Sequence, residues 1–254
     1  MKVVIIGTGN TATVLGKKLR LAGHTILQVF GRDSFAASAL AYELDTESTN
    51  YWNVVNRSAD LYIIAVSDIA VNDIIKELNL PEKTIVHTAA SVSIKIFEEK
   101  ADHYGILYPL QTLTKHSKEI PDVPFIIDAS DPQTLTLLDG LAHSMSNQVI
   151  QANDLDRSKL HLAAVFCNNF VNHLYALAEE YCKKEDLDFS LLHPLILETA
   201  LKVQSESPGT VQTGPAQRHD EQTIKLHEGL LKKHPYLKEM YSFLTNSIVN
   251  ARKF

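Results

Sequence analysis

Three small residues follow a short apolar run near the N-terminus in the pattern Gly-x-Gly-x-x-Ala. Residues 3–6 are mostly β-branched, which is typical of a strand buried on both faces of a parallel sheet. Gly7 would allow a tight turn, Gly9 would let a pyrophosphate reach the backbone, and Ala12 would let the next helix pack on the strand. The N–H groups at the start of that helix would face phosphates, although a structural turn with no ligand is the alternative. The sequence therefore predicts a dinucleotide site made by Gly7, Thr8, Gly9, Asn10, Thr11 and Ala12.

The end of the second predicted strand, residues 25–30, indicates which dinucleotide is bound. An NAD site usually has Asp or Glu here, about 20 residues past the glycines, to hold the ribose 2′-hydroxyl. Gly31 and Arg32 stand here instead, and the Arg32 guanidinium is suited to a 2′-phosphate, with a hydroxyl available from Ser34. We therefore predict NADP(H) as the cofactor, contacted by Gly31, Arg32 and Ser34. The alternative is that Arg32 is a solvated surface residue and that Asp33 holds the ribose of NAD.

Polar side chains recur on one predicted helix. His161, Asn168 and Asn172 are seven and four positions apart, so they share a face of the helix at 154–184, whose middle is apolar nearly all round. Burying polar side chains is costly unless they are hydrogen-bonded. We expect His161 to act as the acid/base, Asn168 to orient the substrate and Asn172 to line the pocket. The alternative is that they bond neighbouring helices or cross a dimer interface.

Further polar residues follow the predicted strands at 61–66, 84–87 and 105–108. Ligands of doubly wound sheets bind beyond the carboxyl ends of the strands, which meet at one edge. Asp68 is expected to cap the helix at 69–78. At that edge we expect Val66 and Ser67 to contact the cofactor, and His87, Tyr108 and Gln111 to line the substrate pocket.

A long connection at residues 207–219 separates two predicted helices. It contains two glycines and two prolines, so we expect it not to be helical. A loop of this length is uncommon unless it is functional or disordered. Arg218 could bind a substrate carboxylate with both of its terminal nitrogens, and a flexible surface loop is the alternative.

The order of predicted elements gives the fold class. Strands and helices alternate up to residue 152, which predicts an α/β domain with a doubly wound, mostly parallel sheet over residues 1–152. Only helices are predicted afterwards, so residues 153–254 should form a smaller all-α domain for substrate binding and dimerisation. The apolar helix at 154–184 needs a second domain or a partner subunit to cover it.

Composition excludes several classes of protein. The 254 residues carry a net charge of −6, which favours neither nucleic acid nor an anionic membrane as a partner. Residues 160–178 lack Asp, Glu, Lys and Arg but contain His and Asn, so no membrane span is expected. Cys167 and Cys182 lie too far apart on one helix to pair, and a cytoplasmic location with reduced thiols is expected. No spacing typical of a metal site is present in the sequence.

Several of these residues also carry a resemblance to known families. Gly7–Ala12, Gly31-Arg32 and Ala65-Val66-Ser67-Asp68 resemble the NADP-binding domains of pyrroline-5-carboxylate reductase, the F420-dependent NADP oxidoreductases and the 6-phosphogluconate dehydrogenase-like group. The whole chain resembles Rossmann-like proteins with a C-terminal domain of unknown function. That match rests on Tyr108-Pro109-Leu110-Gln111-Thr112, the helix at 161–166 with Asn168, and Thr213-Gly214-Pro215-Ala216 with Arg218 and Asp220. The resemblance implies a Rossmann domain, a helical domain that dimerises, and an oxidoreductase with no assigned substrate.

These observations together predict an NADP(H)-dependent oxidoreductase that transfers a hydride between its cofactor and a small carbonyl, imine or alcohol. A homodimer through the C-terminal helices is expected. The dehydrogenase relatives use a Lys on the long helix as their acid/base, and no Lys lies on its predicted buried face. That departure favours a second hypothesis, an NADP(H)-binding sensor or scaffold without turnover. Within the enzyme class, the alternative is an imine reductase of the pyrroline-5-carboxylate reductase type.

Overall fold

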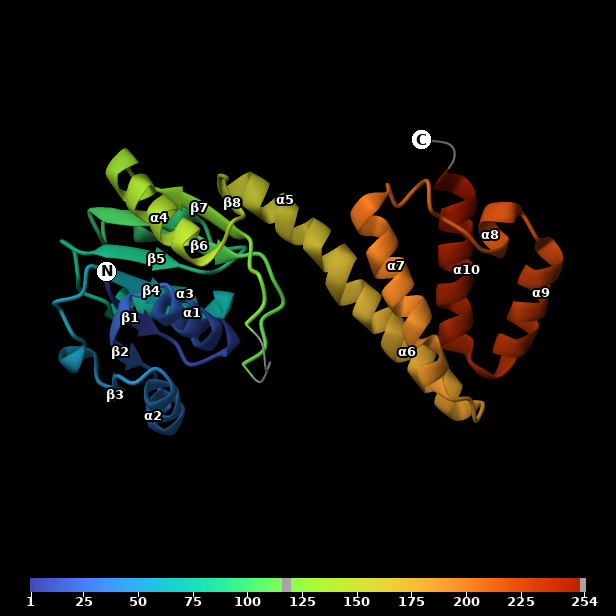
Figure 1. The fold of residues 1–254 in the computed structure, drawn as a ribbon, viewed down its shortest axis with the longest axis horizontal. Coiled ribbons are helices and arrows are strands. Elements are labelled where there is room, and N and C mark those ends of the chain that lie inside the picture. The colour runs from blue at the N-terminus through green and yellow to red at the C-terminus, as the bar shows by residue number, and fades with distance from the viewer. Residues whose placement is uncertain (116–119, 252–254) are drawn as a thin grey trace. The chain divides into compact units, whose positions relative to one another are not determined.

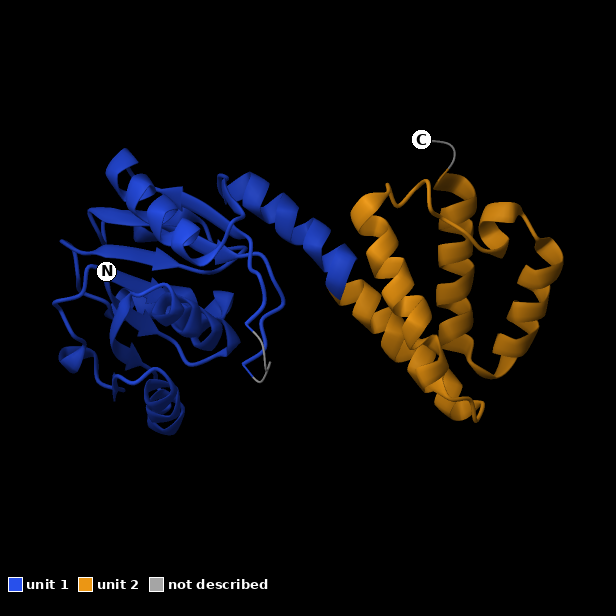
Figure 2. Ribbon diagram, in the orientation of Figure 1, with its two compact units in different colours: residues 1–168 blue, residues 169–254 orange. Residues whose placement is uncertain are grey.

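Two compact units make up the chain, whose computed structural model describes residues 1–115 and 120–251. Unit 1 is Met1–Asn168 and unit 2 is Asn169–Phe254 (Figure 2). The division between the units falls inside the long helical stretch, later than the domain boundary expected after residue 152. The helical stretch runs without a break from Asp154 to Lys184, across the division between the units. The domain boundary expected after residue 152 therefore stays a prediction.

Unit 1 contains one eight-stranded sheet (Figure 1). The strand order is β3-β2-β1-β4-β5-β6-β7-β8, and all neighbours are parallel except β6 and β7. The order reverses between β1 and β4, which is where doubly wound sheets open a crevice for ligands. The predicted fold class is confirmed. The strands are β1 (Lys2–Ile6), β2 (Thr25–Phe30), β3 (Glu47–Thr49), β4 (Leu61–Ile64), β5 (Thr84–His87), β6 (His103–Pro109), β7 (Phe125–Ala129) and β8 (Val149–Gln151).

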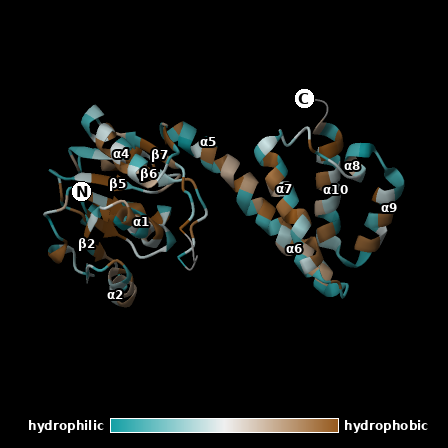
Figure 3. Cartoon of the chain, viewed as in Figure 1, coloured by the Kyte–Doolittle hydropathy of each residue, from teal (hydrophilic) through white to brown (hydrophobic). Residues whose placement is uncertain are grey.

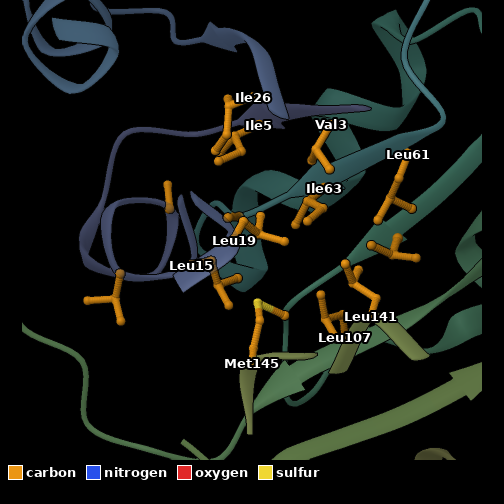
Figure 4. Packing of buried hydrophobic residues seen from close by; sticks show 14 of the residues in the cluster. Val3, Ile5, Leu15, Leu19, Ile26, Leu61, Ile63, Leu107, Leu141 and Met145 are labelled. Atoms are coloured by element: carbon orange, nitrogen blue, oxygen red, sulfur yellow. The ribbon is translucent and has the colours of Figure 1, made fainter. Parts of the chain in front are cut away.

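Helices cover both faces of this sheet because successive side chains of a strand point to opposite faces. Val3 and Ile5 of β1 belong to one apolar cluster with residues of α1, α2 and α4, and Figure 4 shows Leu15 and Leu19 of α1 and Leu141 and Met145 of α4 within it. Val4 and Ile6 belong to a second cluster with residues of α3 and the 3₁₀ helix η2. A third cluster of Ala90, Ile106, Tyr108 and Ile126 packs against Leu160 of α5. The helices of unit 1 are α1 (Asn10–Leu21), α2 (Ser34–Glu43), α3 (Asp68–Glu77), α4 (Pro132–Met145) and α5 (Asp154–Ala164), with the 3₁₀ helices η1 (Trp52–Val54) and η2 (Ile94–Phe97).

The helix expected at 154–184 contains an irregular segment. The chain runs from α5 through a π-helical segment, Val165–Phe170, into α6 (Val171–Lys184). A π-helical turn holds more residues than an α-helical turn, so it changes which residues share a face on either side of it. The expectation that Asn168 continues the face of His161 assumed a regular α-helix between them, and the π-helical segment departs from that geometry.

Unit 2 is all-α over its described residues, as predicted. One expectation is wrong: residues 215–218 of the connection at 207–219 form a helical turn, because Pro215 fits the first turn of a helix and Gly214 adopts a φ of +106° before it. Hydrophobic residues recur along its helices (Figure 3), and many are exposed, including Leu195, Leu201 and Phe243. The remaining elements are η4 (Phe189–Leu192), α7 (His193–Ser205), α8 (Pro215–Arg218), α9 (Glu221–Leu230), η5 (Leu231–Lys233) and α10 (Pro235–Asn250).

Among the described residues, no helix combines the length and the apolar character needed to cross a bilayer.

Candidate functional site

A cavity of about 770 Å³ opens in unit 1 beyond the carboxyl ends of β1, β2, β4, β5 and β6. It extends from the glycine loop and the end of β2 to the end of β6 and one side chain of α5. Most of the residues predicted for the site lie in its wall. Those residues are Gly7, Thr8, Gly9, Asn10, Thr11, Gly31, Arg32, Val66, Ser67, Tyr108, Gln111 and His161.

The two glycines of the loop, Gly7 and Gly9, have different structural roles. Gly7 has a φ of +132°, and a Cβ there would lie 2.2 Å from the Ala65 carbonyl oxygen. Gly9 has an extended backbone, and a Cβ there would meet no atom of the described residues within 4 Å. Gly7 is therefore required by the fold, whereas Gly9 leaves open space at the start of α1 that a side chain would fill.

The start of α1 fits a pyrophosphate. Its N-cap residue, Gly9, has no side chain that could cap the helix, and no acidic residue lies in its first turn. Its first N–H groups and the positive end of its dipole are thus available to an anion. Ala12 is fully buried where the helix meets the sheet, so its role is packing as predicted and it does not line the cavity.

Three neighbouring residues that follow β2 were expected near the cofactor, and the structure gives each of them different surroundings. Arg32 is exposed in the cavity wall, and no carboxylate in residues 1–115 or 120–251 pairs with it. Asp33 instead caps α2, because one of its carboxylate oxygens accepts hydrogen bonds from the N–H groups of Phe35 and Ala36. Ser34 is the first residue of α2 and does not line the cavity. Asp33 also lines the cavity, so this arrangement makes Arg32 available to a 2′-phosphate while the alternative that Asp33 holds a ribose stays open.

Gly31 has a second role in the same wall. A Cβ at Gly31 would lie 2.5 Å from Cγ2 of Thr8. The absence of a side chain there lets the glycine loop approach the end of β2.

Tyr108 and His161 form a hydrogen-bonded pair at the other end of the cavity. Tyr108 is the second-to-last residue of β6 and is 8% exposed, and His161 comes from α5. The Tyr108 hydroxyl lies 2.9 Å from His161 Nδ1, and the two rings meet edge to face. Burial raises the pKa of Tyr108, so its phenol keeps its proton at neutral pH. The pair can hold or donate a proton at a substrate oxygen or nitrogen.

Gln111 belongs to the loop that follows β6, and Asn168 contacts the same loop. Gln111 lines the cavity as predicted, and its amide donates to the Asp122 carbonyl at 3.3 Å. Asn168 donates from its amide to the Thr112 hydroxyl and does not line the cavity. Its expected role as an orienting residue at the substrate is therefore replaced by a contact between the π-helical segment and this loop.

His87 is not in the cavity wall, contrary to expectation. Its ring is fully buried and stacked on Phe97, and its Nδ1 accepts a hydrogen bond from the Ala89 N–H at 3.2 Å. Burial and the nearby charge of Arg157 lower the pKa of His87 to about 4. A strand end determines where a side chain starts but not which face it points to, and this side chain points into the core.

We expect His87 to make the fold sensitive to acid. The folded pKa lies below the value of about 6.5 for an unfolded chain, so the unfolded state binds the extra proton and stability falls as pH drops from 6.5 to 4. The loss is on the order of 3 kcal/mol. Urea unfolding at pH 7 and pH 4 should show a smaller loss in His87→Gln, while the exposed-site control His143→Gln should behave like the native protein.

Asp68 is a site residue whose role the sequence did not indicate. It was expected to cap α3, but it is the first residue of that helix, and its carboxylate instead accepts from the Ser91 N–H at 3.0 Å and from the Ser91 hydroxyl at 2.5 Å. Asp68, Thr88 and Ala90 line the cavity. Asp68 therefore holds the loop after β5 against the cavity, a contact between segments that sequence spacing does not show.

Asn172 and Arg218 belong to unit 2. Asn172 is exposed on α6, and Arg218 is the last residue of α8. Their assignment to the substrate pocket stays a prediction.

Comparisons with known proteins agree with this fold. Residues 2–91 match the family described as NADP oxidoreductase, coenzyme F420-dependent, and residues 123–248 match a domain of unknown function, DUF2520. A solved structure of a proposed NADP oxidoreductase from Bacteroides fragilis is 40% identical and covers 98% of both chains, with a TM-score of 0.91. A comparison with curated proteins found no match.

Two more distant structures share the fold alone. A 1-pyrroline-5-carboxylate reductase from Streptococcus pyogenes is 13% identical, covers 98% of each chain and has a TM-score of 0.67. A reductive aminase from Aspergillus terreus, solved with NADPH and ethyl-5-oxohexanoate, is 15% identical over 99% of this chain and 93% of its own, with a TM-score of 0.69. The full-length similarity to the Bacteroides protein and the two domain matches lead to one assignment: this chain belongs to the NADP oxidoreductase family that joins an N-terminal F420-dependent-type NADP oxidoreductase domain to a DUF2520 domain, and the cofactor of that family is NADP(H).

Proposed function

We propose that the chain is an NADP(H)-dependent oxidoreductase acting on a small carbonyl, imine or alcohol. One observation carries the proposal: a single cavity joins the N-terminus of α1, where Gly9 is the N-cap, and the exposed Arg32 to the Tyr108–His161 pair. Bound NADPH would supply the hydride. The residues of the chain would hold the phosphates, orient the substrate and supply a proton.

Each end of the cavity has its own task in this proposal. The N–H groups of α1 would bind the pyrophosphate beside Gly9, and Arg32 would bind the 2′-phosphate. Tyr108 would donate a proton to the substrate oxygen or nitrogen as it gains negative charge. His161 would hold the phenol in place through its Nδ1 and share the proton with it.

Arg32→Ala is expected to weaken NADPH binding by about 10- to 100-fold, because a charge-assisted hydrogen bond to a phosphate is lost. NADH lacks the 2′-phosphate, so its affinity should not change. Calorimetric titration of both cofactors measures the two affinities. Arg57→Ala is a matched control, since Arg57 is exposed and lies outside this cavity. Unchanged NADPH affinity in Arg32→Ala would contradict the cofactor assignment.

We also propose that the helices of unit 2 form a homodimer. A second cavity of about 400 Å³ lies among α6, α9 and α10, with a wall that includes Leu174, Leu237 and Met240. The same unit leaves Leu195 and Leu201 of α7 exposed. An apolar groove and exposed leucines on one unit are typical of an interface. In a dimer, the leucines of a second copy could cover the groove of the first. Sedimentation equilibrium tests this proposal, and a monomer at all concentrations would contradict it.

A further inference from the structure

Arg157 is a charged residue buried near the start of α5. Its side chain is 1% exposed, and its Nε donates to the Ala90 carbonyl at 3.1 Å. Its Nη2 donates to the Val92 carbonyl at 2.5 Å and to the Asp154 carboxylate at 2.8 Å. One guanidinium therefore joins α5 to the loop of residues 88–93, called here the β5–η2 loop.

Asp154 holds the same loop from the first position of α5. Its carboxylate accepts from the Ser93 hydroxyl at 2.5 Å and from the Ile94 N–H at 3.1 Å. The β5–η2 loop also contains Thr88 and Ala90, which line the cavity. The start of α5 is thus attached to the part of the cavity wall that follows β5.

Stability alone does not explain a buried guanidinium at this position. Removing the charge from water is costly, and an apolar side chain of similar size often stabilises such a position as well or better. Arg157 Nη1 is buried and has no hydrogen-bond partner in the part of the chain that the structure describes. Buried N–H groups are nearly always paired, so this arrangement retains a cost that packing does not require.

The helical period connects Arg157 to the proton-transfer pair. His161 follows Arg157 by four positions, so both side chains lie on one face of α5, one turn apart. Between them, Leu160 packs on the cluster that contains Ala90 and Tyr108. A slip of α5 by one residue would turn this face by about 100° and move His161 away from Tyr108.

We propose that Arg157 is a positioning residue that sets His161 against Tyr108 by fixing the rotation of α5 on the β5–η2 loop. The proposal rests on the assignment of Tyr108 and His161 as the proton-transfer pair. Two carbonyl oxygens on one guanidinium define an orientation that a single bond would not. The hydrogen bond from Arg157 to the Ala90 carbonyl also holds Ala90 in the cavity wall, so the Arg157 side chain aligns both Ala90 and His161.

The test follows the hydrogen bond between Tyr108 and His161 without needing a substrate. In the otherwise native protein, Tyr108→Phe removes the partner of His161 Nδ1 and should shift its nitrogen NMR resonance. In Arg157→Met the same substitution should leave the resonance unchanged, because the hydrogen bond is already lost. Lys159→Met is the control: Lys159 is an exposed cation on the same helix, paired with Asp156, and its loss should leave the Tyr108-dependent shift intact.

Kinetics supply a second readout. Arg157→Met should lower kcat by about 10- to 100-fold, as misplacement of a reacting group does, with NADPH affinity unchanged. Arg157→Lys keeps the charge but cannot bond both carbonyls as the fork does, so it should recover only part of the rate and of the NMR shift.

Retention of the full Tyr108-dependent shift in Arg157→Met would overturn the proposal. If Arg157→Met does not fold, the Tyr108-dependent shift is measured in Arg157→Lys, where retention of the full shift would also overturn the proposal. If neither variant folds, the same measurement is made in Asp154→Asn. A protein that has the native NMR shift but no turnover on any substrate would instead contradict the proposed function and leave the positioning role of Arg157 in place.

Discussion

Gly9→Ala is expected to weaken NADPH binding by about 10- to 100-fold while leaving the free energy of unfolding nearly unchanged. The backbone at Gly9 is extended, and a Cβ there meets no atom within 4 Å in residues 1–115 and 120–251, so this part of the fold accepts a methyl group. The same methyl group would occupy the space through which a pyrophosphate reaches the first N–H groups of α1. Calorimetric titration and urea unfolding measure the two effects separately.

Gly7→Ala should give the opposite result. Its φ of +132° is unfavourable for any residue with a Cβ, and the added atom would lie 2.2 Å from the Ala65 carbonyl oxygen. We expect destabilisation of about 3 kcal/mol or more, from backbone strain and displacement of β4. Gly140→Ala on α4 is the control, since its Cβ also meets nothing, and a gain of about 0.5–1 kcal/mol with native NADPH affinity is expected. Native affinity in Gly9→Ala would show that no pyrophosphate approaches this backbone.

Tyr108→Phe is expected to lower kcat by about 10²- to 10³-fold without changing NADPH affinity. The substitution removes only the hydroxyl that lies 2.9 Å from His161 Nδ1. His161→Gln should have a similar effect, and the double variant should be little worse than either single one, because residues that act as a unit are not additive. NADPH oxidation with a panel of small carbonyls and imines, including pyrroline-5-carboxylate, measures these rates.

Two features make this prediction specific. Tyr104→Phe is a matched control, because Tyr104 lies on the same strand but packs on Phe97 outside the cavity. Burial raises the pKa of Tyr108, so deprotonation of its phenol should not reduce the rate until the pH exceeds the ordinary tyrosine value of about 10. A native kcat in Tyr108→Phe would contradict its role as proton donor. Turnover on no substrate would favour the sensor hypothesis.

Local backbone sterics explain why the sequence predicted the cofactor end of the cavity. The turn at Gly7, the open space at Gly9 and the packing of Ala12 depend on residues close together in the chain, and all three lie as expected. The position of Arg32 follows from the end of β2 in the same way. Short-range geometry of this kind leaves a strong pattern in the sequence.

The substrate end depends on contacts that the sequence does not encode locally. Tyr108 and His161 were both expected at the pocket, but their hydrogen bond requires the placement of α5 on the sheet. His87 was misplaced because strand-end position does not specify the direction of a side chain. Asn168 was misplaced because the π-helical segment changes the helical period. Arg157 was missed because its spacing from Asp154 is the same as in ordinary exposed ion pairs.

A thermal-shift titration of the native protein with NADPH and NADH in parallel tests whether the cavity of unit 1 binds NADP(H). A ligand that binds only the folded state stabilises it by an amount that grows with the logarithm of the ratio of ligand concentration to Kd. The structure predicts a rise in Tm that continues with NADPH concentration and a much smaller rise with NADH, because only NADPH carries the 2′-phosphate that we propose Arg32 binds. The absence of a shift with either cofactor would contradict the account, since the glycine turn would then be structural only.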